Sequence, residues 1–383
     1  MSVMEPSCPV TYEEAAQALH EAASTGNAAI LGGGSRETWF PPAREARTAI
    51  SSSALTGIVR YTPADLTVCV RAGTPLEEVQ RALGEHGQWL PLDPHPAGSV
   101  GGVIAANDNG PVRARYGGVR DALIGVRVAL PNGSVARFGG DVVKNVAGYD
   151  LTKAYVGSAG AFGMLVEATF KVQPLPPVVR AWRIEGPTAA LREAATSLRS
   201  RELPFAALDL AGTTGGQAWH LGALAHGEIE VVDRLGRELA SAASSAGLHA
   251  DETDAGAIEA QAARPSRAGA WMRAGVPRAA SLALLDALPA GVEVIARPSI
   301  GIVEVYGPEA DSEALGGFAA VVAERGGHVH LRLGGAHLRA GFGWWRARDE
   351  GGSRIFGMLK RALDPDLRCN AGRTVYDQHT EEG

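Results

Sequence analysis

Four glycine-rich segments in the first half of the chain could bind a negatively charged group. Glycine has no Cβ, so consecutive backbone N–H groups can converge on an anion such as a phosphate. Serines in three of the segments add hydroxyl donors. The segments are Gly32-Gly33-Gly34-Ser35, Gly98-Ser99-Val100-Gly101-Gly102, Tyr116-Gly117-Gly118 and Gly157-Ser158-Ala159-Gly160-Ala161-Phe162-Gly163. One such loop is typical of an ordinary turn, but the four together favour a cofactor that carries a diphosphate.

The common nucleotide-binding motifs are absent from the sequence. A P-loop requires a Gly-Lys pair, and the chain has none. The dinucleotide fingerprint needs a further glycine at position 37, where Glu37 would instead repel a phosphate. Gly157-x-x-Gly160-x-x-Gly163 precedes an expected strand rather than a helix, and no Gly-x-Ser-x-Gly nucleophile elbow is present. Another arrangement must therefore hold the diphosphate.

Composition narrows the class of protein. The 383 residues are 45% hydrophobic and 20% charged, which is typical of a soluble globular protein of two or three domains. The net charge of −6 argues against nucleic acid as a partner. No apolar run is long enough to span a membrane, and the first residues lack the basic and apolar parts of a signal peptide. We therefore expect a cytoplasmic protein.

Cysteine and histidine offer little metal-binding chemistry. Cys8, Cys69 and Cys369 are too few and too scattered for a disulfide scaffold or an iron–sulfur cluster, which favours a reducing compartment. His328 and His330 would share one face of a strand, with His337 further on, a spacing that permits metal binding. No carboxylate accompanies them between positions 326 and 340, so we predict no metal site.

The elements that must position the glycine loops can be read from local patterns. Thr11 and Glu14 have the spacing of a capping box, which predicts a helix over 11–24. A second helix begins around Thr74-Pro75-Leu76-Glu77 and stops near Gly87. Pro131-Asn132-Gly133-Ser134 is a hairpin turn between strands 124–130 and 135–138. Further strands are expected over 28–31, 66–71 and 164–172.

The character of the sequence changes at Gln173-Pro174-Leu175-Pro176-Pro177, a proline-rich stretch that indicates a domain boundary. Beyond it, Ala-rich helical segments alternate with short strands, a pattern that predicts an α+β domain with an antiparallel sheet. The expected helices cover 188–199, 229–246, 309–324 and 353–363, and expected strands cover 292–295 and 302–306. The predicted organisation is a first domain over 1–173, a second over 178–363 and a C-terminal tail over 364–383.

The order of motifs in the first half resembles a known family. The matching residues are the first glycine loop, Gly73-Thr74-Pro75-Leu76, Ser99-Val100-Gly101-Gly102 with Ala105 and Asn107, Tyr116-Gly117, Arg120-Asp121, the hairpin 123–133 and Gly157-Ser158-Ala159-Gly160 leading into Glu167-Ala168-Thr169. This half resembles the FAD-binding domain of the vanillyl-alcohol-oxidase or p-cresol-methylhydroxylase (PCMH) type. The segment 363–373 resembles the closing motif of that family, with Ala371 where proline is usual. The resemblance implies an α+β fold, in which a PCMH-type FAD-binding domain of two subdomains precedes a smaller α+β domain.

A narrower resemblance rests on the segment 139–151, which includes Lys144-Asn145-Val146-Ala147-Gly148-Tyr149-Asp150-Leu151. It is similar to the smaller FAD-binding subunit, the E subunit, of bacterial glycolate oxidase. The resemblance implies two partners, a larger FAD-linked subunit and an iron–sulfur subunit. It also implies a small 2-hydroxy acid as substrate and peripheral association with the inner membrane through the complex.

The resemblance further implies how FAD would be held. Its pyrophosphate would lie between the first two glycine loops, bound by their amides with Ser35 and Ser99. Non-covalent FAD is expected because Arg36 stands where relatives carry an attachment histidine; His95 is the one nearby candidate for a covalent link. The expected cofactor-binding residues are Gly32, Gly33, Gly34, Ser35, Ser99, Val100, Gly101, Gly102, Tyr116, Gly117, Asp121, Lys144, Gly157, Ser158, Gly160, Gly163 and Leu165.

Catalytic roles are less defined than cofactor binding. Lys144 is a candidate for the flavin ring or a phosphate, or is a solvated surface lysine; Tyr149 is a candidate for the ring or the substrate, or is an ordinary buried tyrosine. Arg332 and Arg339 would clamp a carboxylate or lie on the surface. Trp344-Trp345 would anchor a partner or pack in the core.

The expected function is that of an FAD-dependent oxidoreductase subunit, which oxidises glycolate or a related 2-hydroxy acid to the 2-oxo acid and passes electrons through the flavin to its partners. Two alternatives stay open at this point. One is a non-catalytic FAD scaffold or electron-relay subunit. The other is a self-sufficient FAD-dependent alcohol or hydroxy-acid dehydrogenase.

Overall fold

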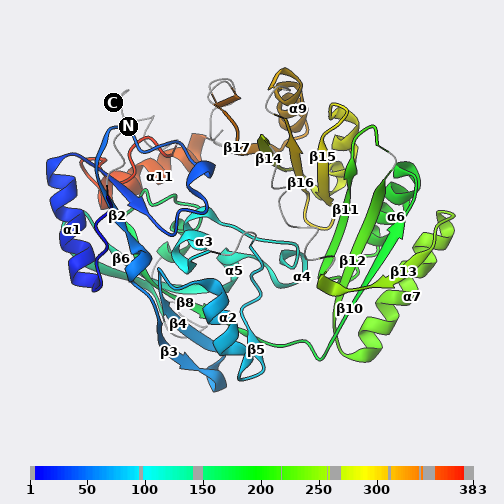
Figure 1. Ribbon diagram of the computed structural model, residues 1–383, viewed down its shortest axis with the longest axis horizontal. Helices are drawn as coiled ribbons and strands as arrows, with labels where there is room; N and C mark the ends of the chain where they lie inside the picture. Colours follow the sequence, from blue (N-terminus) through cyan, green and yellow to red (C-terminus); the bar gives the residue numbers. More distant parts are fainter. Residues whose placement is uncertain are drawn as a thin grey trace. The chain divides into compact units, whose positions relative to one another are not determined.

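The chain divides into two compact units (Figure 1). Unit 1 contains Met1–Asn109, Gly117–Leu175 and Ala347–Gly383, and unit 2 contains Gly110–Tyr116 and Pro176–Arg346. The computed structural model describes residues 5–94, 98–140, 150–216, 218–256, 258, 269–308, 312–335, 338–339 and 350–374. In these ranges no helix combines the length and the apolar character needed to cross a bilayer.

Unit 1 contains a small parallel sheet that leads into the first glycine loop. Strand β1 (Asn27–Leu31) pairs in parallel with β2 (Ala46–Ser51), and the C-terminal segment adds a parallel bridge from Cys369 to Ala28. Helix α1 (Tyr12–Thr25) has the expected capping box, in which the Thr11 side chain accepts a hydrogen bond from the Glu14 N–H. Ala15, Ala16, Leu19 and Ala22 of α1 are buried in one core with residues of β1 and β2.

The second sheet of unit 1 is antiparallel, with strand order β3-β4-β8-β6-β7. The expected hairpin is confirmed, because β6 and β7 pair across residues 131–134 and the Asn132 side chain accepts a hydrogen bond from the Ser134 N–H at 3.0 Å. A short antiparallel pair joins β5 to β9, and β9 lies just before the boundary between the units. The strands are β3 (Ile58–Thr62), β4 (Thr67–Arg71), β5 (Gln88–Trp89), β6 (Leu123–Ala129), β7 (Val135–Gly139), β8 (Met164–Lys171) and β9 (Gln173–Pro174).

Helices complete unit 1, and their apolar residues share one core with the five-stranded sheet. The α-helices are α2 (Leu76–Gly84), α3 (Val100–Ala106), α5 (Val119–Ala122) and α11 (Glu350–Leu363). Short 3-10 helices are η1 (Glu37–Trp39), η2 (Ser52–Ala54), η3 (Pro63–Asp65) and η4 (Leu151–Ala154). Pro75 precedes α2 as its N-cap rather than standing within its first turn.

Two boundaries differ from those expected from the sequence. The second domain was expected to reach 363 and a tail to begin at 364, but unit 2 ends at Arg346 and α11 belongs to unit 1. The reason is packing: Phe356, Leu359 and Leu363 of α11 lie against the core of unit 1, and Lys360 is fully buried there. The short segment Gly110–Tyr116, with helix α4 (Arg113–Tyr116), belongs to unit 2.

Unit 2 is built on an eight-stranded sheet of order β13-β10-β12-β11-β15-β16-β14-β17, with antiparallel pairing throughout. This confirms the expected α+β architecture with an antiparallel sheet. The strands are β10 (Val178–Glu185), β11 (Ala207–Thr213), β12 (Trp219–Gly227), β13 (Ala250–Thr253), β14 (Ala270–Gly275), β15 (Glu293–Arg297), β16 (Ile302–Gly307) and β17 (His328–Leu333).

Helices cover one face of this sheet. Figure 1 shows α6 (Thr188–Ser200) and α7 (Ile229–Ser245) side by side against the green strands, and α9 (Ser312–Glu324) packs on β14 and β17. Short η5 (Arg278–Ala280) and η6 (Leu282–Ala287) lead to β15. Alternate residues of the strands, such as Leu221, Val303 and Met272, point into the core beneath the helices. The intervening residues form the second face of the sheet, where Tyr116 of the segment Gly110–Tyr116 contacts His226 of β12.

Candidate functional site

Three glycine loops of unit 1 surround one cavity. The cavity has a volume of about 80 Å³ and opens to solvent. The lining comes from loop 32–36 after β1, loop 99–102 at the start of α3, loop 159–163 before β8, and Arg373 of the C-terminal segment. We call these loops and their cavity the cradle.

The first loop leaves open space above its backbone. A Cβ built on Gly33 or Gly34 would have no heavy atom of the described chain within 4 Å. Gly34 also has φ +78°, a conformation that L side chains rarely adopt. Ser35 lies next in the loop, and its Oγ accepts a hydrogen bond from Arg36 Nη1 at 2.8 Å, which leaves the hydroxyl proton free to be donated. Backbone amides and a hydroxyl are thus the donors of this loop.

The second loop packs against the first through glycine. Ser99 is the N-cap of α3, and its Oγ accepts a hydrogen bond from the Gly102 N–H at 3.3 Å. A Cβ on Gly32 would lie 3.2 Å from this Oγ, so the two loops approach closely because Gly32 has no side chain. Gly101 serves the fold as well: its N–H donates to Ala72 O at 2.7 Å, and a Cβ there would lie 3.0 Å from the Ala72 Cβ.

The third loop is held by Asn370 of the closing motif. Asn370 Nδ2 donates to Ala159 O at 2.7 Å, and its Oδ1 accepts from the Ile30 N–H at 2.8 Å. A Cβ on Gly160 would lie 2.5 Å from the same amide nitrogen. Asn370 therefore ties β1, which begins the first loop, to the third loop of the cradle.

A buried lysine also holds the C-terminal segment to the third loop. Lys360 of α11 has no exposed surface, and its Nζ donates to Asp364 Oδ2 at 2.7 Å, Ala161 O at 2.6 Å and Cys369 O at 2.7 Å. Asp364 in turn accepts from the N–H groups of Arg368 and Cys369. Every proton of the ammonium has an acceptor, which is what a buried charge requires. The C-terminal segment is therefore a structural part of the cradle.

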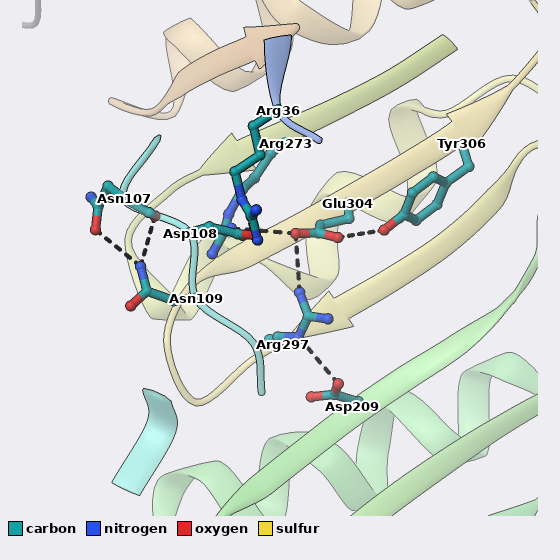
Figure 2. A network of polar contacts seen from close by, with 9 residues as sticks. All are labelled: Arg36, Asn107, Asp108, Asn109, Asp209, Arg273, Arg297, Glu304 and Tyr306. Carbon is teal, nitrogen blue, oxygen red and sulfur yellow. Dashed lines mark hydrogen bonds and ion pairs between the residues drawn. The ribbon is translucent and has the colours of Figure 1, made fainter. Parts of the chain in front are cut away.

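Charged side chains at the cavity occur as opposite pairs. Arg36 is buried and ion-paired with the buried Asp108, with Nη2 2.7 Å from Oδ2 (Figure 2). Glu37 is paired with Arg373 of the C-terminal segment. The negative charge of Glu37, which by itself would repel a phosphate, is thus balanced inside the cavity.

The structure brings together ten of the seventeen residues expected to bind the cofactor. These ten line the cavity: Gly32, Gly33, Gly34, Ser35, Ser99, Gly101, Gly102, Gly160, Gly163 and Leu165. Val100 points into the core of unit 1 instead, with 1% exposure. Gly157 and Ser158 lie at the start of the third loop, where the Gly157 N–H donates to Ile104 O and the Ser158 Oγ accepts from the Gly160 N–H.

The expected Tyr116–Asp121 stretch has structural partners. Tyr116 belongs to unit 2, where its hydroxyl lies 3.1 Å from His226 Nδ1. Asp121 accepts a hydrogen bond from the Gly118 N–H at 2.8 Å and so caps α5, and Gly117, with φ +80°, leaves room for that carboxylate. None of the three lines the cavity.

Several expected residues lie outside the described ranges. They are Lys144, Tyr149, His95, His337, Trp344 and Trp345. His328 and His330 lie two residues apart on β17, as expected. Among the described residues no group of three His, Cys, Asp or Glu side chains is placed to hold a metal ion.

The second face of the unit 2 sheet carries a buried network of charge. Arg297 of β15 donates from Nε to Asp209 of β11 at 3.1 Å, and its Nη1 lies 3.2 Å from Glu304 of β16 (Figure 2). Arg273 of β14 lies opposite Glu304 in the strand register, at 3.6 Å. Arg332 stacks over the Trp271 ring at 4.7 Å. We call Asp209, Arg273, Arg297, Glu304 and Arg332 the charged face.

The network shifts the acid groups in opposite directions. Burial alone raises the pKa of both carboxyls, and for Asp209 it outweighs the attraction of Arg297, so the pKa of Asp209 is raised. For Glu304, burial is outweighed by Arg297, Arg273 and Arg332 together, which lower its pKa to about 2. Glu304 stays ionised, and the Tyr306 hydroxyl donates a hydrogen bond to it.

Sequence reasoning missed three important side chains of the cradle. Arg373 was predicted only as the end of the closing motif and Arg36 only as a replacement for histidine, and no role was predicted for Lys360. The signal available for Lys360 was its rarity, since only four lysines occur in the chain, and its position four residues before Asp364 on a helix. Pairing of Glu37 with Arg373, 336 positions away, has no local signal.

Comparisons with known proteins agree with this geometry. A family model described as an FAD binding domain matches residues 7–139. Glycolate oxidase subunit GlcE of Escherichia coli is 41% identical over 150 residues, which cover 38% of this chain and 42% of that protein. Glycolate oxidase subunit GlcD of Bacillus subtilis is 40% identical over 114 residues, or 29% of this chain and 24% of that protein. A mitochondrial D-lactate dehydrogenase of Arabidopsis thaliana is 40% identical over 112 residues, or 29% of this chain and 20% of that protein.

Solved structures extend the likeness to the whole chain at the level of fold. Alkyldihydroxyacetonephosphate synthase superposes with a TM-score of 0.72 over 95% of this chain and 76% of its own, at 18% identity. In sequence, the matches span less than half the length of the curated relatives. The matched region contains the first two loops of the cradle, and residues 7–139 of this chain are therefore an FAD-binding domain.

Proposed function

We propose that this chain is the FAD-binding subunit of a complex that oxidises glycolate, or a closely related 2-hydroxy acid, to the 2-oxo acid. The supporting observation is the 41% identity over 150 residues to a glycolate oxidase subunit, together with the glycine-lined cradle of unit 1. Other relatives are named D-lactate dehydrogenase and D-2-hydroxyglutarate dehydrogenase. All of these names describe oxidation of a hydroxyl next to a carboxylate.

The residues of the cradle fit the diphosphate of FAD. Gly33 and Gly34 leave room for phosphate oxygens near the main chain, and Ser35 and Ser99 have hydroxyl protons to donate. When bound, FAD would supply the acceptor for the hydride of the 2-hydroxy acid. The side chains that we propose for the chemistry itself are Lys144 and Tyr149, which lie outside the described ranges.

Unit 2 has the character of a substrate domain. On its charged face, three arginines accompany two carboxyls. A surplus of guanidinium groups suits a substrate that carries a carboxylate. We propose that this face contributes to recognition of the acid.

Electrons from the flavin would leave through partner subunits. Of the three cysteines, Cys69 and Cys369 are buried and Cys8 is exposed, so they do not form a set of ligands for an iron–sulfur cluster. We propose a larger FAD-linked subunit and an iron–sulfur subunit as partners, in a complex that is cytoplasmic or attached peripherally to the inner membrane.

Stopped-flow absorbance of the flavin tests this function. The purified chain, loaded with FAD, is mixed with glycolate alone and then in the presence of the larger flavoprotein subunit. We expect reduction of this chain's flavin only in the presence of that subunit. Rapid bleaching by glycolate alone would instead show a self-sufficient dehydrogenase. Lack of bleaching in both mixtures would show a scaffold that does not exchange electrons.

A further inference from the structure

Of the charged residues that line the cradle, Arg373 has the ion pair that a ligand could most easily replace. Three charged side chains are found among the described residues that line the cavity: Arg36, Glu37 and Arg373. Arg36 and Asp108 are both buried, with side chains 5% and 3% exposed, and the carboxylate takes two hydrogen bonds from the guanidinium. Both partners of that pair are thus held to each other inside the protein.

Arg373 is equally buried, but its partner is not. The Arg373 side chain is 5% exposed, whereas the Glu37 side chain is 42% exposed. Arg373 Nε is buried and has no hydrogen-bond partner among the described residues. Burial lowers the pKa of Arg373 to about 10, so the guanidinium is still charged at neutral pH but poorly solvated. A buried cation with an unused donor and an exposed counter-ion is suited to accept a stronger anion.

The backbone around Arg373 is fixed firmly enough to aim it. The Arg373 N–H donates to Asn370 O at 3.1 Å, and the Arg44 N–H donates to Ala371 O at 2.7 Å. Asn370 is itself bonded to β1 and to the third loop. Glu37, in contrast, begins the short helix η1, and its side chain is partly exposed. The guanidinium therefore stays in place while the carboxylate can turn to solvent.

We propose that Arg373 binds the diphosphate of FAD, and that Glu37 forms an ion pair with the Arg373 guanidinium until FAD binds. This inference rests on the proposed function, because it takes the cradle to be the diphosphate site. A diphosphate carries more charge than a carboxylate and can accept two hydrogen bonds from the planar guanidinium. Glu37 then moves into water, where its charge costs little.

The test is equilibrium titration of the full chain, freed of flavin, with FAD, followed by quenching of flavin fluorescence. Arg373→Gln is expected to raise the Kd for FAD by about 10- to 100-fold, the usual effect of losing hydrogen bonds to a charged group. Glu37→Gln is expected to lower the Kd by about 3- to 10-fold, because the competing carboxylate is gone. Arg127→Gln is the matched control, since it breaks an arginine–carboxylate pair of unit 1 outside the cavity and should leave the Kd within about two-fold.

A second measurement separates binding from a structural role. The thermal midpoint is recorded without and with FAD. We expect Arg373→Gln to keep the midpoint of the apoprotein and lose most of the FAD-induced rise. If Arg373→Gln does not fold, Arg373→Lys replaces it, and a smaller loss of affinity, about 3- to 10-fold, is expected because the charge remains without the planar fork.

The inference is overturned if the Arg373 variants bind FAD within two-fold of the parent chain, or if Arg373→Gln and Glu37→Gln weaken FAD binding and lower the apoprotein midpoint equally, as a structural ion pair would. These results differ from a failure of the proposed function. In that case the parent chain itself would not bind FAD, or would bind it and never take part in glycolate oxidation.

Discussion

The cradle of unit 1 and the charged face of unit 2 provide groups that can bind an anion in different ways. The cradle uses backbone N–H groups and two serine hydroxyls around open glycines, and its charged side chains are paired at the edge of the cavity. The charged face uses charged side chains from five strands, buried together on one side of a sheet. A site made of backbone is encoded locally by small residues, whereas a site made of side chains depends on the register of strands far apart in sequence.

The largest effect is expected from a substitution that disrupts the charged face alone and lowers the stability of unit 2. Arg297→Met leaves Asp209 and Glu304 buried without their shared cation, which should destabilise unit 2 by about 3–5 kcal/mol. Hydrogen exchange of the β15 and β16 amides measures this loss. FAD affinity should be unchanged while the protein is folded, since every cradle residue belongs to unit 1.

Arg192→Met is the control for that variant. Arg192 forms an ion pair with Asp286 whose side chains are 27% and 65% exposed, so its loss should cost less than about 1 kcal/mol. Equal effects of the two substitutions would contradict the account of a buried network, and so would loss of FAD from folded Arg297→Met protein.

The next largest effect is expected from a substitution that disrupts the cradle alone and weakens FAD binding. Gly33→Glu places a carboxylate in open space beside the phosphate site, and we expect the Kd for FAD to rise at least about 100-fold with little change in the thermal midpoint of the apoprotein. Gly101→Glu is a poorer test, because a side chain there would meet Ala72 and disturb the fold.

Gly84→Glu provides the matched control for Gly33→Glu. Gly84 ends α2, is exposed, and has no atom within 4 Å of its Cβ position, but it lies outside the cavity. It should bind FAD like the parent chain. Normal FAD binding by Gly33→Glu would mean that the phosphates bind elsewhere.

A third prediction concerns pH and applies to unit 2. Burial, and then Arg115, lower the pKa of His226 from 6.5 to about 4. A depressed pKa means that the folded state holds the neutral ring, so its stability is present above pH 6.5 and is lost as the pH falls through about 4. His226→Gln should flatten this loss, which is on the order of 2 kcal/mol, in hydrogen exchange of β12.

Glu304 makes a separate contribution to the stability of unit 2 at low pH. Its pKa is lowered from 4.5 to about 2, so the stability that it contributes is present above pH 4.5 and is lost toward pH 2. In His226→Gln protein the loss between pH 4 and 2 should therefore persist. A profile unchanged by His226→Gln between pH 6.5 and 4 would contradict the assignment.

The smallest expected effect is at the junction of fold and cradle. Ser99→Ala removes the cap of α3 and one hydroxyl donor, which should cost about 1 kcal/mol of stability and raise the Kd for FAD about 3- to 10-fold. Ser24→Ala is the control, because Ser24 is an exposed helix residue that bonds only within α1. Equal FAD affinity of the two variants would remove Ser99 from the phosphate site.

The difference between the two regions also explains what the sequence could predict. The capping box of Thr11 and Glu14 and the glycines at 32–34 act within a few residues, so their roles follow from local chemistry. The pairs Glu37–Arg373 and Asp209–Arg297 join residues that only the fold brings together. The place of α11 depended on the burial of Lys360, a residue type usually assigned to the surface.

Binding of FAD to the purified full chain is the measurement that tests the cradle most directly. We predict that the folded chain takes up one FAD per molecule with micromolar or tighter affinity, and that Gly33→Glu removes this binding while Gly84→Glu retains it. A well-folded parent chain that stays colourless in excess FAD, or a Gly33→Glu variant that binds FAD as the parent does, would contradict the account.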